Sequence, residues 1–455
     1  MAFLADLKSD SDYGWGRNAV NTICVGRGAY LSELAELANW YGWRGSHIGQ
    51  IVDSLPDPSF IIQSREHISF STNNYLAIAT SPRMKQAAIR GIEAYGVGNC
   101  ESRLLSGNLG IYGELEQKLA RSKKQTRAIL FATGYLANIG ALSTLPRVAQ
   151  YARAFGFTPS REHSYAYFGD ELNHISLREG IRNSGAARSS YRHLDLDHLE
   201  TLLRRSRAST KIIVTDGVFS QDGDIAPVPD LIDLAERYDA MLYIDDAHGT
   251  GVLGATGGGI LEYFNVNSER LIYMGTLSKA YGAMGGFIAT SALIVETLRL
   301  TCSAYGFTST LPPDQALAVN TAMDMVQDEP DRRTRLWNNQ RYFVSRMSET
   351  GFDLLSTETP IVPILVGDEA KAETLAAAML AERIHVDAIK FPAVPMNKAR
   401  IRIQLNASHT AHQIDHLVDG LCAHRNLFER NGTHSPTVSR QPHVLPKARR
   451  SAANQ

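Results

Sequence analysis

The chain contains 455 residues, of which 44% are apolar and 20% are charged, a composition typical of a soluble globular protein rather than a disordered or fibrous one. Its net charge of −1 argues against nucleic acid or an anionic membrane as a partner, because these bind strongly basic surfaces. The start, MAFLADLKSDSDYGWG, lacks the basic and apolar segments of a secretory signal, and no apolar run approaches a membrane span, so we expect a cytoplasmic protein.

Residues 1–70 are expected to form an N-terminal arm with one possible helix, AYLSELAELANWYGW, and one short strand, IIQSREHISFS. From residue 71 onward, apolar strand candidates alternate with helical stretches: AILFA precedes TGYLANIGALSTL, KIIVTDG precedes PDLIDLAERYD, and MLYIDD and LIYMG follow. This alternation predicts an α/β domain over 71–310 with a parallel sheet, whose ligands gather at the carboxyl ends of the strands.

A pair of prolines in LPPDQ (311–315) interrupts the chain, and a long helical stretch follows. Two further strand candidates, PIVPILV and ARIRIQL, predict a smaller α+β domain over 311–430. The polar residues 431–455 show no hydrophobic period and are expected to be disordered. The four cysteines lie far apart without paired spacing, which indicates neither a zinc knuckle nor a disulfide framework.

The segment MLYIDDAHGTG places two acids at the end of a predicted buried strand. Period two points either Asp245 or Asp246 toward the ligand edge, where a buried carboxylate needs a cation or a donor, and His248 could lie over the same ligand. An aspartate that caps a loop beside a core histidine is the alternative, and no third ligand with suitable spacing supports a metal site. The glycines from Gly249 to Gly254 match a dinucleotide fingerprint, but the following ATGGG cannot begin the required helix.

Lys279 lies between small residues in YMGTLSKAYGAMGGF, directly after an apolar run. A lysine that must reach a buried electrophile needs close backbone approach and an easily lost proton, whereas a surface lysine needs neither. After the strand at 128–131, Thr133 is a plausible cap for a helix that begins near Gly134 and Tyr135, and its free N–H groups could hold a phosphate.

Other polar residues follow predicted strands. His174 lies between a strand and a helix, and the turn after KIIVTDG brings Asp216 and Ser220 to the rim. In ARIRIQL, Arg400 and Arg402 share one strand face, where a guanidinium could bind a carboxylate, although an exposed basic edge is the alternative. Together, an acid, an imidazole, a phosphate site, a lysine and an arginine at strand ends meet the requirements of pyridoxal phosphate.

The sequence resembles the α-oxoamine synthases, a family of fold-type I pyridoxal-phosphate acyltransferases. The likeness extends from about Ser71 to about Phe428 and depends on strings in the family's order: NNYLAIATSP, ELEQKLA, LNHIS, TDGVFSQDGDIAP, IDDAHGTGVLG, GTLSKAYGAMGG, FTSTLPP, FPAVP and ARIRIQLNASHT. The resemblance implies a large domain with a mostly parallel seven-stranded sheet and a smaller C-terminal α+β domain.

The resemblance also implies roles for individual residues. Lys279 corresponds to the Schiff-base lysine, Asp245 to the acid at the pyridine nitrogen, His248 to the donor at the phenolic oxygen, and His174 to the residue stacked on the ring. The implied phosphate contacts are Gly134, Tyr135, Thr276 and, from a neighbouring subunit, Thr308. The implied groups at the amino-acid carboxylate are Asn74, Ser220 and Arg402, with Arg400 as the alternative to Arg402.

The implied reaction joins glycine, alanine or serine to an acyl thioester of CoA or acyl carrier protein and releases CO2 and the thiol, leaving an α-aminoketone. The implied assembly is a homodimer with shared active sites, and no metal, nucleic acid or membrane takes part. Two alternatives are another fold-type I reaction, such as transamination or aldol cleavage, and a non-catalytic partner or regulatory protein. The retained Lys279 argues against the second.

Three features depart from the family pattern. Tyr112 stands where many members have a histidine, Ala77 replaces a frequent glycine, and residues 147–166 look like an insertion. All three are expected near the approach of the acyl donor, so they leave the acyl chain and its carrier open.

Overall fold

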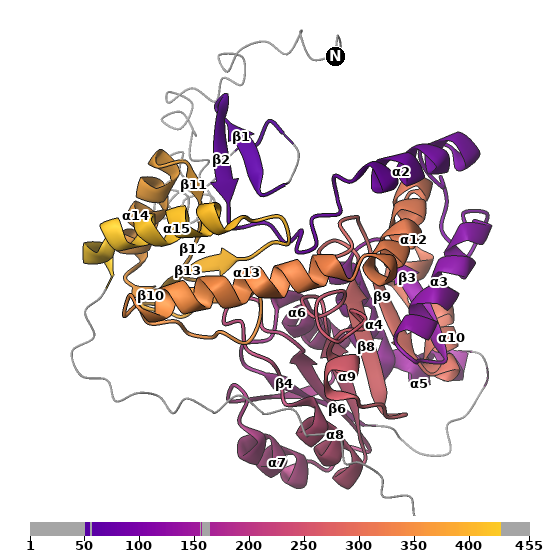
Figure 1. Ribbon diagram of the computed structural model, residues 1–455. Helices are drawn as coiled ribbons and strands as arrows, with labels where there is room; N and C mark the ends of the chain where they lie inside the picture. Colours follow the sequence, from indigo (N-terminus) through magenta and orange to yellow (C-terminus); the bar gives the residue numbers. More distant parts are fainter. Residues whose placement is uncertain (1–50, 55–56, 155, 157–163, 429–455) are drawn as a thin grey trace, which may run out of the picture. The chain divides into compact units, whose positions relative to one another are not determined.

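The computed structural model describes residues 51–54, 57–154, 156 and 164–428 (Figure 1). The described residues fall into two units, one that contains residues 51–53 and Ile62–Ser64 and a second that contains the rest of the described chain from residue 54 to residue 428. The predicted arm helix and the tail at 431–455 lie outside the described residues. The second unit carries the fold, and the domain boundaries expected at 70, 310 and 430 stay predictions.

The largest sheet has seven strands in the order β3-β9-β8-β7-β6-β4-β5. The two pairings of β9, with β3 and with β8, are antiparallel and all the others are parallel, which confirms the mostly parallel sheet. Its strands are β3 Arg127–Phe131, β4 Tyr165–Asp170, β5 Ala187–Tyr191, β6 Thr210–Asp216, β7 Ala240–Asp245, β8 Leu271–Thr276 and β9 Gly286–Thr290.

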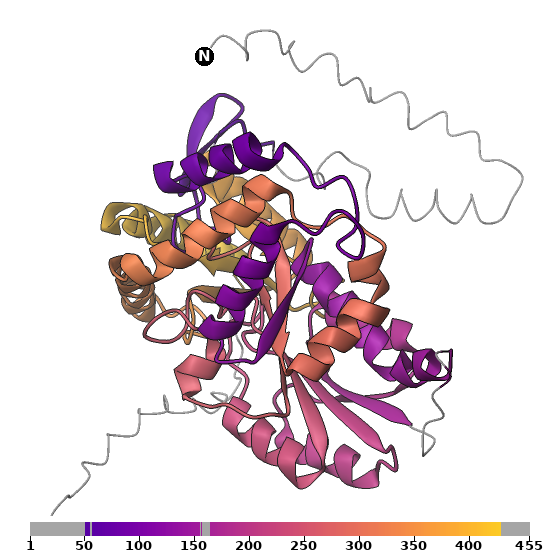
Figure 2. The same cartoon turned by 90° about the vertical axis from the view of Figure 1, so that its right-hand side faces the viewer.

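Apolar cores cover both faces of this sheet. Along β7, Leu242 and Ile244 belong to one buried cluster and Tyr243 to another, as the alternation of side chains in a strand requires. Figure 2 shows helices on both sides of the strands. The flanking helices are α2 Pro82–Tyr95, α3 Gly110–Ser122, α4 Gly134–Thr144, α5 Val148–Ala154, α6 Ile175–Ser184, α7 Leu196–Arg205, α8 Val228–Arg237, α9 Ile260–Phe264, α10 Ala292–Thr301 and α11 Ser303–Gly306, with a 3₁₀ turn, η2, at Leu145–Arg147.

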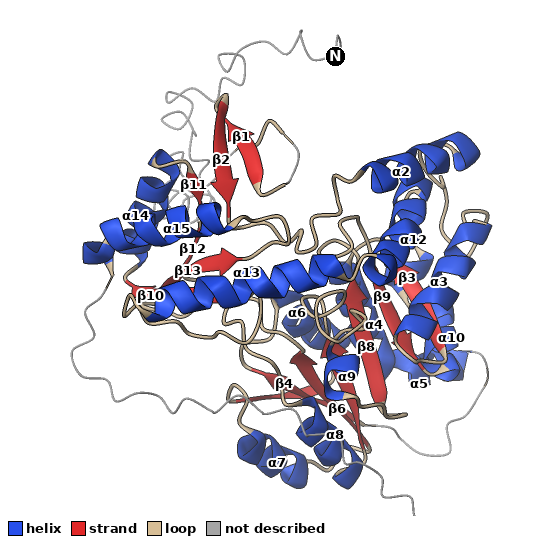
Figure 3. Cartoon of the chain, viewed as in Figure 1, coloured by secondary structure: helices blue, strands red, loops and turns tan. Residues whose placement is uncertain are grey.

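Two three-stranded sheets accompany the large one (Figure 3). The sheet β10-β13-β12 is antiparallel and contains the two strands predicted from PIVPILV and ARIRIQL. The expectation of one strand in IIQSREHISFS is wrong, because a left-handed turn at Gln63 and Ser64 separates two strands. The strands of these sheets are β1 Ser59–Ile62, β2 Arg65–Ser69, β10 Ile361–Gly367, β11 Ile384–His385, β12 Asp387–Ile389 and β13 Ala399–Gln404.

A long helix, α13, contacts both the large-sheet region and the loop after β13. Its Trp337 Nε1 donates to the carbonyl of Val252 at 3.3 Å, and its Asn339 Nδ2 donates to the carbonyl of Asn406 at 2.9 Å. The C-terminal helices are α12 Pro313–Asp328, α13 Asp331–Ser348, α14 Glu369–Ala381, α15 Ala411–Ala423 and the 3₁₀ turn η3 Arg425–Leu427. In the described part of the chain, no helix has the length and apolar character to cross a membrane.

Candidate active site

Three of the predicted site residues meet at the carboxyl ends of β7 and β8. Asp245 ends β7 and pairs with Met274 of β8, and Lys279 follows soon after β8 ends. The turn after β7 carries His248, whose Nε2 lies 2.8 Å from Lys279 Nζ. Two neighbouring parallel strands therefore bring together the acid, the imidazole and the amine.

The protein lowers the affinity of Lys279 for its proton. Desolvation lowers the pKa of Lys279 to about 8, against the opposing charge of Asp245. Burial and then the charge of Lys279 lower the pKa of His248 well below its usual value, so this imidazole is neutral. A lysine that titrates close to neutral pH can act both as a nucleophile and as a proton carrier.

Asp245 is fixed by donors on both carboxylate oxygens. Asn138 Nδ2 donates to Oδ2 at 2.7 Å and the Ala247 N–H donates to Oδ1 at 3.0 Å. Asn138 is itself oriented by the hydroxyl of Tyr243, which donates to its Oδ1 at 2.8 Å. The carboxylate is therefore buried, held in one orientation and suited to meet a cationic group.

The structure separates the two acids that the sequence left open. Asp246 accepts from the Ile260 N–H at 2.9 Å and from the Tyr273 hydroxyl at 2.5 Å. Desolvation raises the pKa of Asp246 to about 6 despite the nearby positive charge of Lys123. Asp246 thus belongs to a structural network, and Asp245 is the acid beside Lys279.

His174 lies within electrostatic reach of the same group. His174 caps α6, and its backbone N–H donates to Asp216 Oδ2 at 2.7 Å. Partial desolvation lowers the pKa of His174, opposed by the charge of Asp245, although the side chain stays open to solvent. Desolvation, then the charge of Asp245, raises the pKa of Asp216 well above its usual value.

The N-terminus of α4 offers an anion site. Thr133 caps the helix, and the following Gly134 lies so close to Thr276 that an added Cβ would come within 3.2 Å of its Oγ1. A Cβ on Gly286 would lie 2.5 Å from the Cα of Gly134, a close approach that only glycine permits. The first N–H groups of α4, which a helix leaves without partners inside it, therefore start beside the Thr276 hydroxyl.

Two other predicted phosphate contacts lie farther toward the surface. Tyr135 is 44% exposed, and its hydroxyl donates to the carboxylate of Glu179. Thr308 follows α11 beside Phe307, which is 87% exposed. The part assigned to Thr308 of a neighbouring subunit stays a prediction, because the structure contains one chain.

The two candidate arginines differ in the partners that they already have. Arg400, whose side chain is buried, forms an ion pair with the partly exposed Asp222. Arg402 Nη1 donates to the carbonyl of Ser220 at 3.4 Å, and Nη2 lies 3.5 Å from Asp387 Oδ2, directly across the strand pair. The Nε of Arg402 is buried without a partner, so Arg402 keeps donor capacity that Arg400 has already used.

Asn74 organises its own turn. Its Oδ1 accepts from the N–H groups of Ile78 and Ala79 at 3.2 and 3.4 Å, and its carbonyl accepts from Asn406 Nδ2 at 2.6 Å. Within this turn Ala77 has φ +53°, which explains why glycine suits this position. The predicted role of Asn74 at a substrate carboxylate stays a prediction.

The structure also describes part of the departures from the family pattern. Tyr112 is fully buried, and its hydroxyl donates to the carbonyl of Leu311 at 2.6 Å. The expected insertion at 147–166 contains α5 and the start of β4, and its residues 155 and 157–163 lie outside the described chain. Its influence on the acyl donor stays a prediction.

Three contributors were missed at the sequence level: Tyr75, Asn138 and Gln404. Asn138 is one turn after Gly134 in an otherwise apolar helix, which marks it as an amide that needs a buried partner. Gln404 continues the period-two row that contains Arg402, so the same alternation could have identified it. Tyr75 gives no comparable signal within NNYL.

This arrangement fits pyridoxal phosphate. An amine of lowered pKa faces a buried carboxylate, and a helix N-terminus with a close glycine pair lies beside them. The amine can react with the aldehyde of the cofactor, the carboxylate can pair with its protonated pyridine nitrogen, and the helix N-terminus can bind its phosphate. Among the described residues, no group of three or more histidine, cysteine, aspartate or glutamate side chains could hold a metal ion.

Comparisons with known proteins point the same way. Residues 65–421 match the family model for aminotransferase class I and II. The 8-amino-7-oxononanoate synthase of Symbiobacterium thermophilum is 41% identical over 79% of this chain and 88% of its own. The 8-amino-7-oxononanoate synthase 1 of Bacillus velezensis is 38% identical over 86% of this chain and 95% of its own. The serine palmitoyltransferase of Sphingomonas wittichii superposes with a TM-score of 0.78 at 27% identity, over 88% of this chain and 97% of its own.

Proposed function

Because the chain belongs to the α-oxoamine synthase family of pyridoxal-phosphate enzymes, we propose that it condenses alanine with a heptanedioyl (pimeloyl) thioester to form 8-amino-7-oxononanoate. The chain is a pyridoxal-phosphate-dependent acyltransferase that joins a small amino acid to an acyl thioester. The choice of alanine and of the seven-carbon diacid rests on the product for which its relatives are named.

The carbon skeleton of that product identifies both substrates. C8 carries the amine and a methyl group, C9, and C7 is the ketone carbon. Since the amino acid loses its carboxylate as CO2, C8 and C9 correspond to the α-carbon and methyl group of alanine. C1 to C7 correspond to a diacid joined to its carrier as a thioester. The Cα–H bond of alanine breaks first, and the C7–C8 bond then forms as the C7–S bond breaks and releases the thiol. The bond from this carbon to its carboxylate breaks with loss of CO2, and C8 finally takes a proton.

Each residue beside the reacting atoms has a proposed task. When bound, pyridoxal phosphate supplies an electron sink for the carbanion at the α-carbon of alanine. Lys279 attaches the cofactor covalently and moves the α-proton, for which a pKa of about 8 suits it. Asp245 keeps the pyridine nitrogen protonated, His248 donates to the phenolic oxygen, and His174 supports the ring face.

The remaining contacts hold the two charged ends. Gly134, Tyr135 and Thr276 bind the phosphate around the N-terminus of α4. The proposed groups at the alanine carboxylate are Asn74, Ser220 and Arg402, of which Arg402 has the unpartnered Nε.

We also place the enzyme in the cytoplasm as a homodimer whose partner subunit contributes Thr308 to each site. The proposal covers either CoA or acyl carrier protein as the carrier of the acyl group.

The observation that carries the proposal is the 2.8 Å approach of Lys279 Nζ to His248 beside the buried Asp245. The test incubates the cofactor-loaded protein with pimeloyl-CoA and alanine, glycine or serine, and follows thiol and CO2 release and product mass. We expect 8-amino-7-oxononanoate from alanine and little turnover of the other two. Formation of pyruvate with alanine alone, or preference for glycine or serine, would overturn it.

A second measurement identifies the lysine. Borohydride reduction followed by peptide mapping should place the cofactor on Lys279. Lys123 is the matched control, because its pKa is also lowered to about 8 by burial. We expect Lys279→Ala to abolish both trapping and turnover, and Lys123→Met to retain trapping; label on Lys123 contradicts the assignment.

A further inference from the structure

A chain of hydrogen bonds leads away from Lys279 into the small antiparallel sheet. Lys279 Nζ meets His248 Nε2 at 2.8 Å, and the other ring nitrogen, Nδ1, meets the hydroxyl of Tyr75 at 2.7 Å. That hydroxyl lies 3.3 Å from Gln404 Nε2, which also donates to Asn73 Oδ1 at 2.6 Å. Lys279 and Tyr75 thus contact the two ring nitrogens of His248, and Gln404 contacts the ring only through Tyr75.

The chain of donors determines where the imidazole carries its proton. An amide nitrogen can only donate, so Gln404 occupies an acceptor position on the phenol oxygen and leaves its single proton for another partner. Nδ1 of His248 is 2.7 Å away, whereas Asn73 Oδ1 is 3.5 Å away. When Lys279 is a neutral amine, its Nζ can accept from Nε2, so the phenol donates to Nδ1 and the neutral ring carries its proton on Nε2. A charged Lys279 can only donate and would instead place the ring proton on Nδ1.

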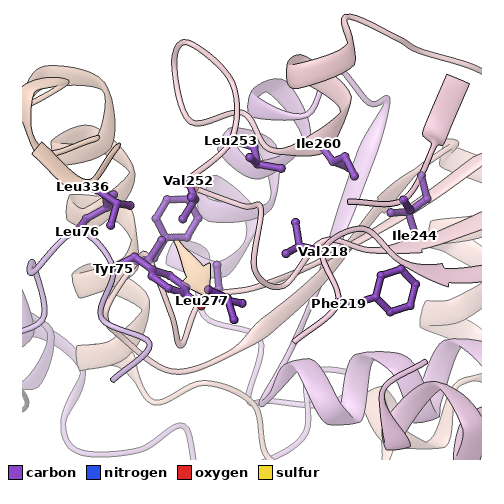
Figure 4. Close-up of a cluster of buried hydrophobic side chains, with 14 of the residues drawn as sticks. Tyr75, Leu76, Val218, Phe219, Ile244, Val252, Leu253, Ile260, Leu277 and Leu336 are labelled. Carbon is purple, nitrogen blue, oxygen red and sulfur yellow. The ribbon is translucent and has the colours of Figure 1, made fainter. Parts of the chain in front are cut away.

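Burial stabilises this arrangement. Desolvation raises the pKa of Tyr75 to about 12, so the phenol keeps its proton. Tyr75 packs in the same buried cluster as Val252 and Leu277, which fixes its ring (Figure 4). The positive charges of Lys279 and Arg402 further disfavour a charged His248, so the choice lies between two neutral tautomers.

We propose that Tyr75 and Gln404 are positioning residues that hold His248 as its Nε2–H tautomer and so present a hydrogen-bond donor to the phenolic oxygen of pyridoxal phosphate. The proposal rests on the proposed function, because that function places the cofactor at Lys279. It adds a path by which the small sheet, through β13, controls a group at the reacting atoms.

The first test reads the tautomer directly in the cofactor-free protein at about pH 9.5, where Lys279, whose pKa is about 8, is a neutral amine that can accept from Nε2–H. With ¹⁵N-labelled histidine, the ring nitrogens of His248 are assigned by difference against His248→Asn. We expect a protonated Nε2 and an unprotonated Nδ1 in the wild type. In Gln404→Glu, a carboxylate of nearly the same shape draws the phenol proton away, so the proton should move to Nδ1. An unchanged Nε2–H pattern in Gln404→Glu and Tyr75→Phe would overturn the proposal.

The second test uses the visible spectrum of the bound cofactor. A donor at the phenolic oxygen lowers the pH at which the cofactor chromophore titrates, so its loss in Tyr75→Phe or Gln404→Glu should raise that pH by about one unit. Tyr167→Phe is the matched control, because Tyr167 is fully buried and its hydroxyl donates to the carbonyl of Leu142 at 2.6 Å. We expect no spectral shift in Tyr167→Phe; an equal shift there would assign the effect to general loosening and refute the positioning role.

The two tests also separate failure of this proposal from failure of the proposed function. A protein that stays colourless with pyridoxal phosphate, or makes no product from alanine, contradicts the function, while the ¹⁵N measurement still decides the tautomer. If Tyr75→Phe does not fold, the ¹⁵N measurement on Gln404→Glu alone decides. A proton moved to Nδ1 supports the proposal, and a proton retained on Nε2 contradicts it.

Discussion

At the scale of single residues, we expect substitution of the adjacent acids Asp245 and Asp246 to have different effects. Asp245→Asn removes the charge that keeps the pyridine nitrogen protonated, and we expect exchange of the α-proton of alanine to fall by roughly a hundredfold or more. Proton NMR of alanine in D2O, without thioester, measures this step alone. Asp246→Asn is the matched control: it disturbs the contacts with Ile260 and Tyr273 and should lower stability while exchange continues. Unimpaired exchange in Asp245→Asn would refute its role.

Ala77 predicts a gain of stability. Its φ of +53° lies in the left-handed region, which costs an L-residue about 1 kcal/mol, whereas glycine adopts it freely. After the extra entropy of an unfolded glycine, Ala77→Gly should raise the free energy of unfolding by about 0.5 kcal/mol. Ala79→Gly, two residues later in the same loop, should instead lower it. Urea denaturation of both variants compares them, and a loss in Ala77→Gly would show that the alanine is not strained.

Predictability from sequence differs among the site residues for a physical reason. Asp245, His248 and Lys279 follow strands whose apolar runs mark where each strand ends, so their proximity follows from the parallel sheet. The strand pattern alone could not choose between the arginines, and only the resemblance favoured Arg402, because the choice depends on Asp222 and Asp387, which reach the arginines from other segments. Long-range partners of this kind leave no local pattern.

At the scale of elements, one histidine joins two strand ends. His193 follows β5, with Nδ1 3.0 Å from Asp170 Oδ1 at the end of β4 and Nε2 3.0 Å from Asp224 Oδ2 in the turn after β6. The backbone N–H of His193 donates to the carboxylate of Glu171. Its ring meets Phe219 edge-on at 4.5 Å. Through these contacts His193 holds the turn that contains Ser220.

The charge of His193 predicts a pH dependence. Desolvation lowers its pKa, but the hydrogen bonds to Asp170 and Asp224 outweigh this and raise it to about 10. Since the folded pKa exceeds the unfolded value of about 6.5, the stabilisation is complete below about pH 6.5 and is lost as pH rises toward 10.

The variant that tests this dependence is His193→Gln, which should cost about 3 kcal/mol at pH 6 and much less at pH 10. Urea denaturation at both values gives the difference. His412→Gln, on the exposed start of α15, should show a small cost at both. An equal cost of His193→Gln at the two pH values would contradict a charged bridge.

The strands that were predicted from sequence include three that are buried on both faces of the sheet. β6, β7 and β8 appear as apolar runs because the sheet is covered on both faces. β5 was missed because ARSSY is a mostly exposed edge strand without an apolar pattern, and β9 because GFIAT is short and follows a glycine-rich loop. Sequence periodicity therefore found the strands with a clear apolar run, including the edge strand β3, and missed the two strands that lack one.

At the scale of the whole molecule, the turn after β6 meets the small antiparallel sheet. A Cβ on Gly223 would lie 2.4 Å from the carbonyl of Ile361, and Thr359 Oγ1 donates to the Gly223 carbonyl at 2.8 Å. Arg400 and Arg402 of β13 face this turn, so one element both joins the sheets and is proposed to bind the substrate.

The two arginines can therefore be told apart. Arg402→Gln removes a charged donor from the alanine carboxylate, and we expect KM for alanine to rise about 10- to 100-fold with a smaller change in kcat. Arg400→Gln leaves Asp222 without its cation and should mainly lower the melting temperature. Steady-state kinetics and thermal denaturation of both variants decide, and a larger KM effect in Arg400→Gln would reverse the assignment.

The proposed dimer makes the sharpest prediction at this scale, because a shared site allows two inactive chains to complement each other. In a heterodimer of Lys279→Ala and Thr308→Asp chains, one site lacks the lysine and repels the phosphate, while the other has Lys279 from one chain and Thr308 from the other. We expect both homodimers to be inactive and the heterodimer, co-expressed with two tags and purified through both, to show about half of the wild-type activity.

The matched control for complementation pairs Lys279→Ala with Asp245→Asn. Lys279 and Asp245 lie together within one chain, at the ends of adjacent strands, so each site of this heterodimer lacks one of them. We expect no recovery of activity in this pair. Recovery here would show that activity can return without a shared Thr308, and the result with the Thr308→Asp chain would then not support a shared site. No recovery with the Thr308→Asp chain would mean that Thr308 acts within its own subunit or not at all, and the shared site would have to be abandoned.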